Sequence, residues 1–207
     1  MKIEVFAFDW SGVISDDRRP VYEANMRLME HYGLPRMTFE EWLPQTTASA
    51  VEFMANHGVR ADRARLFDLY TRFFNAANAE GIVPTVYSHA ADVLNSLKRK
   101  GRINVVLSAH PAENLMREAR EYGLEQFLTS ITGSSSNKAD SLREIVAQHG
   151  VKPEAVLYSG DTIYDIRHAK QAGVRSAGIV GGYHTRERLA DENPDVVGEL
   201  PVIETLV

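Results

Sequence analysis

The sequence predicts an α/β fold, a doubly wound parallel sheet with an inserted all-helical cap. Three observations lead to this prediction. Short apolar runs without clear alternation recur along the chain, as in strands buried on both faces. A helical pattern follows each run, and alternating strands and helices form right-handed βαβ units. A stretch of about 70 residues after the first run carries helical patterns only.

Four apolar runs bounded by turn residues are predicted as buried strands, and a fifth run is a candidate. They are Ile3–Phe8, Ile103–Leu107, Ala155–Tyr158, Ser176–Val180 and the candidate Asp195–Val197. Each helix between them has a start signal and a terminal glycine. The pairs of start and stop are Ser88 and Gly101, Pro111 and Gly123, Asp140 and Gly150, and Asp161 and Gly173.

Residues 16–85 interrupt this rhythm with three helical patterns. The first runs from Pro20 to Gly33, the second begins at the capping box of Thr38 to Glu41, and the third spans roughly Asp62 to Ala79. We therefore expect an α/β core of residues 1–15 and 86–207 and a helical cap of residues 16–85.

Composition narrows the classes of function. The chain of 207 residues is 44% hydrophobic and 25% charged, as in an ordinary globular protein. A net charge of −5 argues against nucleic acid or an anionic membrane as a partner. Without cysteine there is no disulfide and no thiolate site. We find neither a signal peptide nor an apolar run long enough to span a membrane, so we expect a cytoplasmic monomer or homodimer.

Polar residues follow the predicted strands, where doubly wound sheets bind ligands. These residues are Asp9, Trp10, Ser11 and Gly12; Ser108, Ala109 and His110; Lys138 after a Ser/Gly-rich loop; and Asp161, Thr162 and, one turn later, Asp165. Crowded carboxylates repel one another, and Mg²⁺, which prefers carboxylate and water oxygens, relieves that repulsion. A hydroxyl, backbone N–H groups and a lysine suit a phosphoryl group, and a carboxylate can attack phosphorus. The pattern therefore predicts a magnesium-dependent phosphoryl-transfer site.

The same segments resemble the four ordered motifs of the haloacid dehalogenase-like hydrolases, which have a Rossmann-like core. The segments are Phe8–Val13, Val105–Ser108, Lys138 and Gly160–Asp165. The insert is similar to the helical cap of the phosphoglycolate phosphatase-like branch. The resemblance implies that Asp9 is nucleophile and metal ligand, with Asp161, Asp165 and the Ser11 carbonyl as further ligands. It also implies that Ser108, Ala109 and Lys138 bind the phosphoryl group of a small phosphorylated metabolite.

Ser11 departs from the family pattern. Most phosphatases of this kind have an aspartate there, which protonates the leaving oxygen and then activates water. A serine hydroxyl is a poor general acid or base, and such catalysis typically contributes about 10²–10⁴-fold. A catalytically weak protein that binds phosphate, or a slow phospho-aspartate sensor or scaffold, therefore stays open as an alternative.

Three related chemistries fit these residues less well. Phosphonoacetaldehyde hydrolases share the Asp-Trp-small-Gly opening but need a cap lysine, and no lysine lies between Lys2 and Lys98. True haloacid dehalogenases use no metal, which the pair of Asp161 and Asp165 argues against. A receiver-like domain would not need the helical insert.

Four further residues are weaker candidates for substrate contact. They are Trp10, Arg18 at the entry to the insert, His110, which could also shuttle a proton, and Trp42. Packing or an ordinary surface position is the competing explanation for each.

Overall fold

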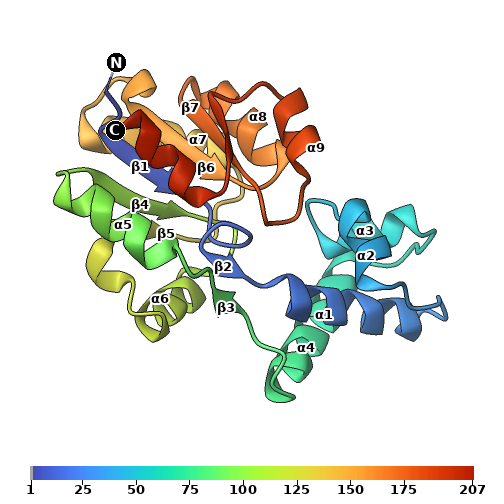
Figure 1. Cartoon of the computed structure of the whole chain (residues 1–207). Coiled ribbons are helices and arrows are strands. Elements are labelled where there is room, and N and C mark those ends of the chain that lie inside the picture. The colour runs from blue at the N-terminus through green and yellow to red at the C-terminus, as the bar shows by residue number, and fades with distance from the viewer. Residues whose placement is uncertain (1) are drawn as a thin grey trace. The chain divides into compact units, whose positions relative to one another are not determined.

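The computed structural model describes residues 2–207, which form two compact units (Figure 1). The α/β unit comprises the chain up to Ser15 together with Val86–Val207, and the helical unit comprises Asp16–Thr85. Both crossings of the chain between the units lie in a two-stranded sheet of β2 (Ser15–Asp16) and β3 (Thr85–Val86).

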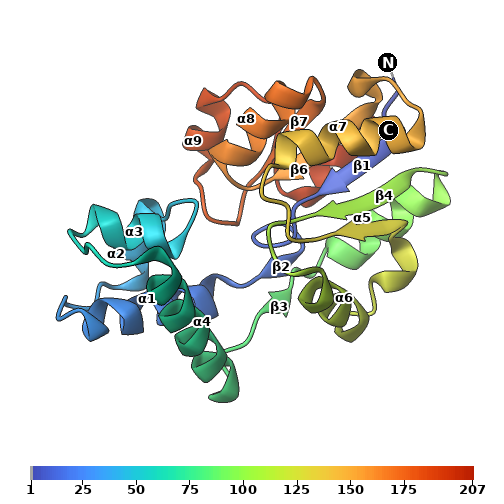
Figure 2. The same cartoon turned by 180° about the vertical axis from the view of Figure 1, so that it is seen from behind.

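The α/β unit is built on a six-stranded sheet with the order β5-β4-β1-β6-β7-β8 (Figures 1 and 2). Its strands are β1 (Val5–Phe8), β4 (Ile103–Leu107), β5 (Ser130–Thr132), β6 (Val156–Gly160), β7 (Arg175–Ile179) and β8 (Val196–Gly198). All five pairings are parallel, and β1 lies between β4 and β6, with Phe8 opposite both Val106 and Ser159. The doubly wound parallel sheet predicted from the sequence is confirmed.

Both faces of this sheet are buried because successive side chains of a strand point to opposite sides. Phe6 and Phe8 pack on the face covered by α5 (Ala90–Arg99), α6 (Ala112–Glu121) and the 3₁₀ segment η4 (Leu200–Leu206). Val5 and Ala7 pack on the other face, against α7 (Lys138–His149) and α8 (Ile163–Ala172). Burying each large apolar side chain contributes roughly 1.5–3 kcal/mol, so the central strand is held rigidly from both sides.

The helix starts differ from the predicted ones by a few residues. Asn137, not Asp140, caps α7, because its side-chain oxygen accepts hydrogen bonds from the Ala139 and Asp140 amides. Lys138 is therefore the first residue of α7. Thr162, not Asp161, caps α8, in a capping box with Asp165. Helix α5 begins after His89 without a side-chain cap, and Pro111 lies at the N-cap of α6 rather than inside it.

Several short elements were not predicted. β5 is a three-residue, half-buried edge strand, too short to give a hydrophobic pattern. The helix α9 (Arg186–Asp191) and the 3₁₀ segments η2 (Glu125–Phe127) and η3 (Pro153–Ala155) are also short. None of the helices within residues 2–207 is long and apolar enough to cross a bilayer.

The helical unit contains α1 (Arg18–His31), α2 (Phe39–Trp42), η1 (Leu43–Gln45), α3 (Ala50–Asn56) and α4 (Arg63–Ala79). Helix α4 packs against both α1 and α3. The predicted capping box of Thr38 and Glu41 is present at α2. The short helix α3, capped by Ser49, had no separate prediction.

Candidate active site

Three aspartates meet at the carboxyl ends of β1 and β6. Asp9 directly follows β1, Asp161 directly follows β6, and Asp165 lies in the first turn of α8. Each offers a carboxylate oxygen, and these oxygens lie within 4.8 Å of one another. All three residues are buried, Asp9 at 7% exposure and the other two at 2% or less. The adjacency of β1 and β6 in the sheet explains why residues about 150 positions apart in sequence converge.

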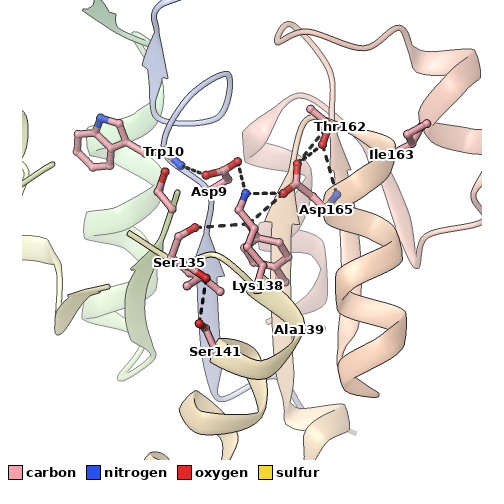
Figure 3. A network of polar contacts seen from close by, with 12 residues as sticks. Asp9, Trp10, Ser135, Lys138, Ala139, Ser141, Thr162, Ile163 and Asp165 are labelled. Atoms are coloured by element: carbon pink, nitrogen blue, oxygen red, sulfur yellow. Dashed lines mark hydrogen bonds and ion pairs between the residues drawn. The ribbon is translucent and has the colours of Figure 1, made fainter. Parts of the chain in front are cut away.

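Lys138 joins two of these carboxylates. Its Nζ lies 2.7 Å from Oδ2 of Asp9 and 2.7 Å from Oδ1 of Asp165, and Figure 3 shows the ammonium between them. Because Asn137 caps α7, the lysine stands at the very start of a helix whose other residues anchor it to the sheet. Oδ1 of Asp9 accepts the backbone N–H of Trp10 at 2.8 Å. The Asp9 carboxylate is therefore held at both oxygens.

Asp165 is held by four donors. Its Oδ2 accepts the Thr162 hydroxyl at 2.5 Å and the Thr162 amide at 3.2 Å, which closes the capping box of α8. Its Oδ1 accepts Lys138 and the Tyr158 hydroxyl at 3.1 Å. Tyr158 projects from β6 and is 1% exposed. This carboxylate has a fixed orientation even without a ligand.

Asp161 lies between two glycines that allow the backbone to approach it. A Cβ at Gly12, whose φ is +73°, would lie 2.1 Å from Oδ2 of Asp161, and one at Gly182 would lie 2.2 Å from the same oxygen. The Tyr183 amide donates to that oxygen at 2.7 Å. A side chain at either glycine would displace the carboxylate.

Burial and mutual repulsion shift the titration of these groups. Burial raises the pKa of Asp161 well above its ordinary value, and the charges of Asp165 and Asp9 raise it further. Burial also raises the pKa of Asp9, although the Lys138 charge opposes this. For Asp165, the Lys138 charge and hydrogen bonds outweigh burial, so its pKa is lowered. The Asp165 and Asp9 charges likewise outweigh burial at Lys138, whose pKa is raised well above its usual value.

This donor set fits Mg²⁺. Oxygens about 2.1 Å from an octahedral ion lie about 3–4.2 Å apart, and the three carboxylate oxygens, all within 4.8 Å of one another, are close to that spacing. One ammonium cannot neutralise three buried carboxylates, and beside the burial that chiefly raises the pKa of Asp161, the charges of Asp165 and Asp9 raise it further. A divalent cation would supply the missing charge.

The residues after β4 lie beside this cluster. Ser108 directly follows β4, the neighbour of β1, one position beyond the residue in register with Asp9, and Ser108 is 1% exposed. The loop of residues 133–137 is bonded to the same segment, because the Ser135 amide donates to the Ser108 carbonyl and the Ser134 amide to the His110 carbonyl. Ala109 is exposed and His110 half-buried. The fold thus brings the predicted hydroxyl and loop to the edge where Asp9 lies.

The structure contradicts substrate contact for two tryptophans. Trp10 is fully buried, its indole N–H donates to Glu118 at 2.6 Å, and its ring stacks on Tyr122. Figure 3 shows its ring on the side of Asp9 away from Lys138. Trp42 is fully buried inside the helical unit, against Phe39 and Tyr22. Both side chains pack in the protein interior, as large aromatic rings commonly do.

Arg18 has an acidic partner close by in sequence. Its guanidinium forms a two-pronged ion pair with Asp16, with both N–O distances 2.7 Å. This ion pair holds the start of α1. It engages the Arg18 guanidinium, which was a candidate for binding an anionic substrate.

Comparison with known proteins identifies the family. The model of the haloacid dehalogenase-like hydrolases matches residues 6–179. The chain belongs to this family. The match includes Asp9, Ser108, Lys138, Asp161 and Asp165, the residues on which the sequence resemblance was based.

Relatives of the chain carry the name phosphoglycolate phosphatase. That of Haemophilus influenzae is 27% identical over 95% of this chain and 94% of its own, and that of Aliivibrio fischeri is 22% identical over 95% and 92%. With the proteins of Synechococcus elongatus and Salmonella typhimurium, the match spans only 56% and 52% of the relative's length.

Solved structures share the family fold. A haloacid dehalogenase-like hydrolase of Streptococcus pneumoniae superposes with a TM-score of 0.83 at 18% identity, covering 98% of this chain and 97% of its own. A predicted phosphoglycolate phosphatase of Haemophilus somnus gives 0.80 at 17% identity, covering 99% and 98%. At such identities the likeness establishes the fold alone.

Ser11, which departs from the family motif, lies in a tight turn. The carbonyl of Trp10 accepts the amides of Val13, Ile14 and Ser15, and Ser11 is bridged to Ser15. Ser11 is half-buried. The turn is thus fixed by the backbone, and the serine leaves it without the carboxyl group that is common there in the family.

Two residues of the site were missed from the sequence. Tyr158 lies in an otherwise apolar run, and its hydroxyl, two residues before the strand end, was a usable signal. His184, which is 4% exposed, accepts the Ile163 amide through Nδ1 at 3.1 Å. It follows β7 after a Gly-Gly pair, and the rule of inspecting every strand end would have found it.

Proposed function

We propose that the chain is a Mg²⁺-dependent phosphatase that acts on a small phosphorylated metabolite through an aspartyl-phosphate on Asp9. The observation that carries this proposal is the position of Asp9. Its carboxylate lies 2.7 Å from Lys138 and inside the cluster of three carboxylates at the carboxyl edge of the sheet. A nucleophile, a cation for phosphate oxygens and a metal site therefore coincide.

The protein groups have distinct roles in this proposal. Lys138 and the Ser108 hydroxyl, with the amide of Ala109, would bind the non-bridging phosphoryl oxygens. The Trp10 amide on Oδ1 orients Asp9 so that Oδ2 is presented to phosphorus. Asp161 and Asp165 would hold the ion together with Asp9 and the Ser11 carbonyl, and the ion would reduce repulsion between nucleophile and phosphoryl group.

The reaction would proceed in two displacements. Oδ2 of Asp9 forms a bond to phosphorus while the bond from phosphorus to the leaving oxygen breaks, and that oxygen takes a proton from solvent or a nearby group. Water then attacks phosphorus, releases inorganic phosphate and restores the Asp9 carboxylate. Dividing the hydrolysis in this way replaces one difficult step by two easier ones.

The substrate class is proposed from the relatives. Proteins 22–27% identical to this chain are named phosphoglycolate phosphatases, which favours a small phosphorylated organic acid. The helical unit would act as a cap that admits substrate and then excludes water. We also propose a cytoplasmic location, a monomer or homodimer, and no nucleic-acid partner.

The test is phosphate release from a panel of phosphomonoesters that includes 2-phosphoglycolate. We expect turnover with Mg²⁺, none with EDTA, and none for Asp9→Asn. The matched control is Asp140→Asn, which removes an exposed carboxylate from the first turn of α7. Equal turnover by Asp9→Asn and wild type would refute the proposal.

Ser11 favours a second function, that of a slow phospho-aspartate sensor or phosphate-binding scaffold. Without a general acid and base at this position, the aspartyl-phosphate would persist. No turnover across the panel, together with Mg²⁺-dependent binding of BeF₃⁻, would support this function. Faster hydrolysis of an aryl phosphate by Ser11→Asp would show that the missing carboxyl group limits the wild type.

A further inference from the structure

The loop after β7 is bonded to the segment that carries Asp161. The Tyr183 amide donates to Oδ2 of Asp161 at 2.7 Å, and the His184 amide donates to the Asp161 carbonyl at 3.3 Å. Oδ2 of Asp161 also lies against Gly182, where no Cβ could fit. The main chain of this loop thus fixes both the carboxylate and the backbone of Asp161.

The side chain of His184 extends this attachment to α8. Its Nδ1 lies 3.1 Å from the amide nitrogen of Ile163, the first residue of that helix. Because an amide N–H donates, Nδ1 must be the unprotonated nitrogen, which assigns the ring proton to Nε2. His184 is 4% exposed, so the ring has a fixed position in the interior.

This bond satisfies a group that α8 cannot satisfy itself. The first amides of a helix have no partner within the helix. The Thr162 side chain accepts the amide of Asp165, while the Ile163 amide is accepted by His184. Loss of the imidazole would leave this amide without its acceptor, which favours a shift of the first turn. Asp165 stands in that turn.

We propose that His184 is a positioning residue for the metal site, holding Asp161 and Asp165 at the separation that a divalent cation needs. The proposal rests on the metal site of the proposed function. His184 is not among the proposed ligands of the ion or the substrate. It acts through the backbone of residues 161–163, which it ties to the loop after β7. Outer-shell partners of this kind typically change metal affinity by about 10–100-fold.

The experiment compares side chains that keep or lose the acceptor, with Mg²⁺ affinity measured by isothermal titration calorimetry. His184→Asn places an oxygen where Nδ1 lies, His184→Gln places one near Nε2, and His184→Leu has none. The control is His57→Leu, which removes another imidazole whose Nδ1 bonds a backbone group, the Phe53 carbonyl at 2.8 Å in the helical unit. Circular dichroism establishes that each variant is folded.

We expect Mg²⁺ affinity to fall about tenfold or more in His184→Leu and His184→Gln, and to stay within about threefold of wild type in His184→Asn and His57→Leu. Wild-type affinity in a folded His184→Leu would overturn the proposal. If that variant does not fold, equal affinities of the Asn and Gln variants would overturn it. A wild-type protein that binds no Mg²⁺ would instead refute the metal site of the proposed function, and this proposal with it.

Discussion

The Nζ of Lys138 lies 2.7 Å from Oδ2 of Asp9. This ion pair crosses from the start of α7 to the end of β1, and it places a cation on the oxygen proposed to attack phosphorus. An incoming phosphoryl group would share the lysine with Asp9, which would bring the substrate to its nucleophile. Because Lys138 bonds Asp9 and Asp165, Asp161 is the carboxylate of the site without a direct cationic partner within residues 2–207.

Replacement of Asp161 by asparagine should stabilise the metal-free protein. The variant keeps an acceptor for the Tyr183 amide but removes a buried charge that Asp165 and Asp9 repel. We expect a gain of about 1–2 kcal/mol in EDTA, since burying a charge costs several kcal/mol, and loss of stabilisation by Mg²⁺. Urea unfolding with EDTA or Mg²⁺ measures both effects. A less stable Asp161→Asn in EDTA would contradict this account, and Asp140→Asn is the control.

Removal of the Tyr158 hydroxyl should loosen Asp165. The hydroxyl donates to Oδ1 at 3.1 Å in the protein interior, and hydrogen bonds to charged groups contribute about 1.5–3 kcal/mol. We expect Tyr158→Phe to destabilise the protein by that amount and to weaken Mg²⁺ binding. Tyr22→Phe, which removes a hydroxyl bonded to the Met37 carbonyl in the helical unit, should leave Mg²⁺ binding unchanged. Unchanged Mg²⁺ affinity in Tyr158→Phe would show that this bond is not needed at the site.

Replacement of two glycines with similar positive φ angles should distinguish the cost of backbone strain from the cost of a steric clash with Asp161. Gly58, with φ at +83°, has open space where a Cβ would lie, whereas Gly12, with φ at +73°, has Oδ2 of Asp161 there. Gly58→Ala should cost only the left-handed backbone strain, about 1–2 kcal/mol. Gly12→Ala should cost more and also reduce Mg²⁺ affinity. Equal urea midpoints for the two variants would argue against a close approach at Gly12.

His184 should make stability depend on pH. Burial, together with the Arg188 charge, lowers its pKa from 6.5 to about 4. A lowered folded-state pKa means that the unfolded chain binds the proton more readily, so this contribution is complete above pH 6.5 and is lost as pH falls towards 4. In EDTA, wild type should therefore lose stability relative to His184→Asn between pH 7.5 and 4.5. Parallel curves of urea midpoint against pH for the two proteins would contradict the shift.

Much of the architecture followed from local pattern. The strands β1, β4, β6 and β7 were predictable because they are buried on both faces and therefore mostly apolar, with single polar residues such as Asn104 and Ser159 among them. β5 was not, because a three-residue edge strand carries no periodicity. The capping residues were misplaced because Asn137 and Thr162 compete with nearby aspartates whose side chains are equally good caps.

The site was predictable only in part. Asp9, Asp161, Asp165 and Lys138 could be brought together from the sequence because strand ends of a parallel sheet share one edge. The supporting contacts of Tyr158 and His184 could not, since they depend on distances across the sheet and between loops. Trp10 and Trp42 were wrongly predicted as candidates for substrate contact, because no local sequence pattern distinguishes an aromatic ring in a core from one that faces a ligand.

The central claim is that Asp9 carries the phosphoryl group. Sodium borohydride reduces an acyl phosphate to an alcohol, which would convert a phosphorylated Asp9 to homoserine. The protein is incubated with Mg²⁺ and a phosphomonoester that it hydrolyses, or with acetyl phosphate, then reduced, and its peptides are analysed by mass spectrometry. We predict homoserine at position 9 in the wild type and not in Asp9→Asn. Phosphate release with an unreduced Asp9, or homoserine at another aspartate, would contradict the account.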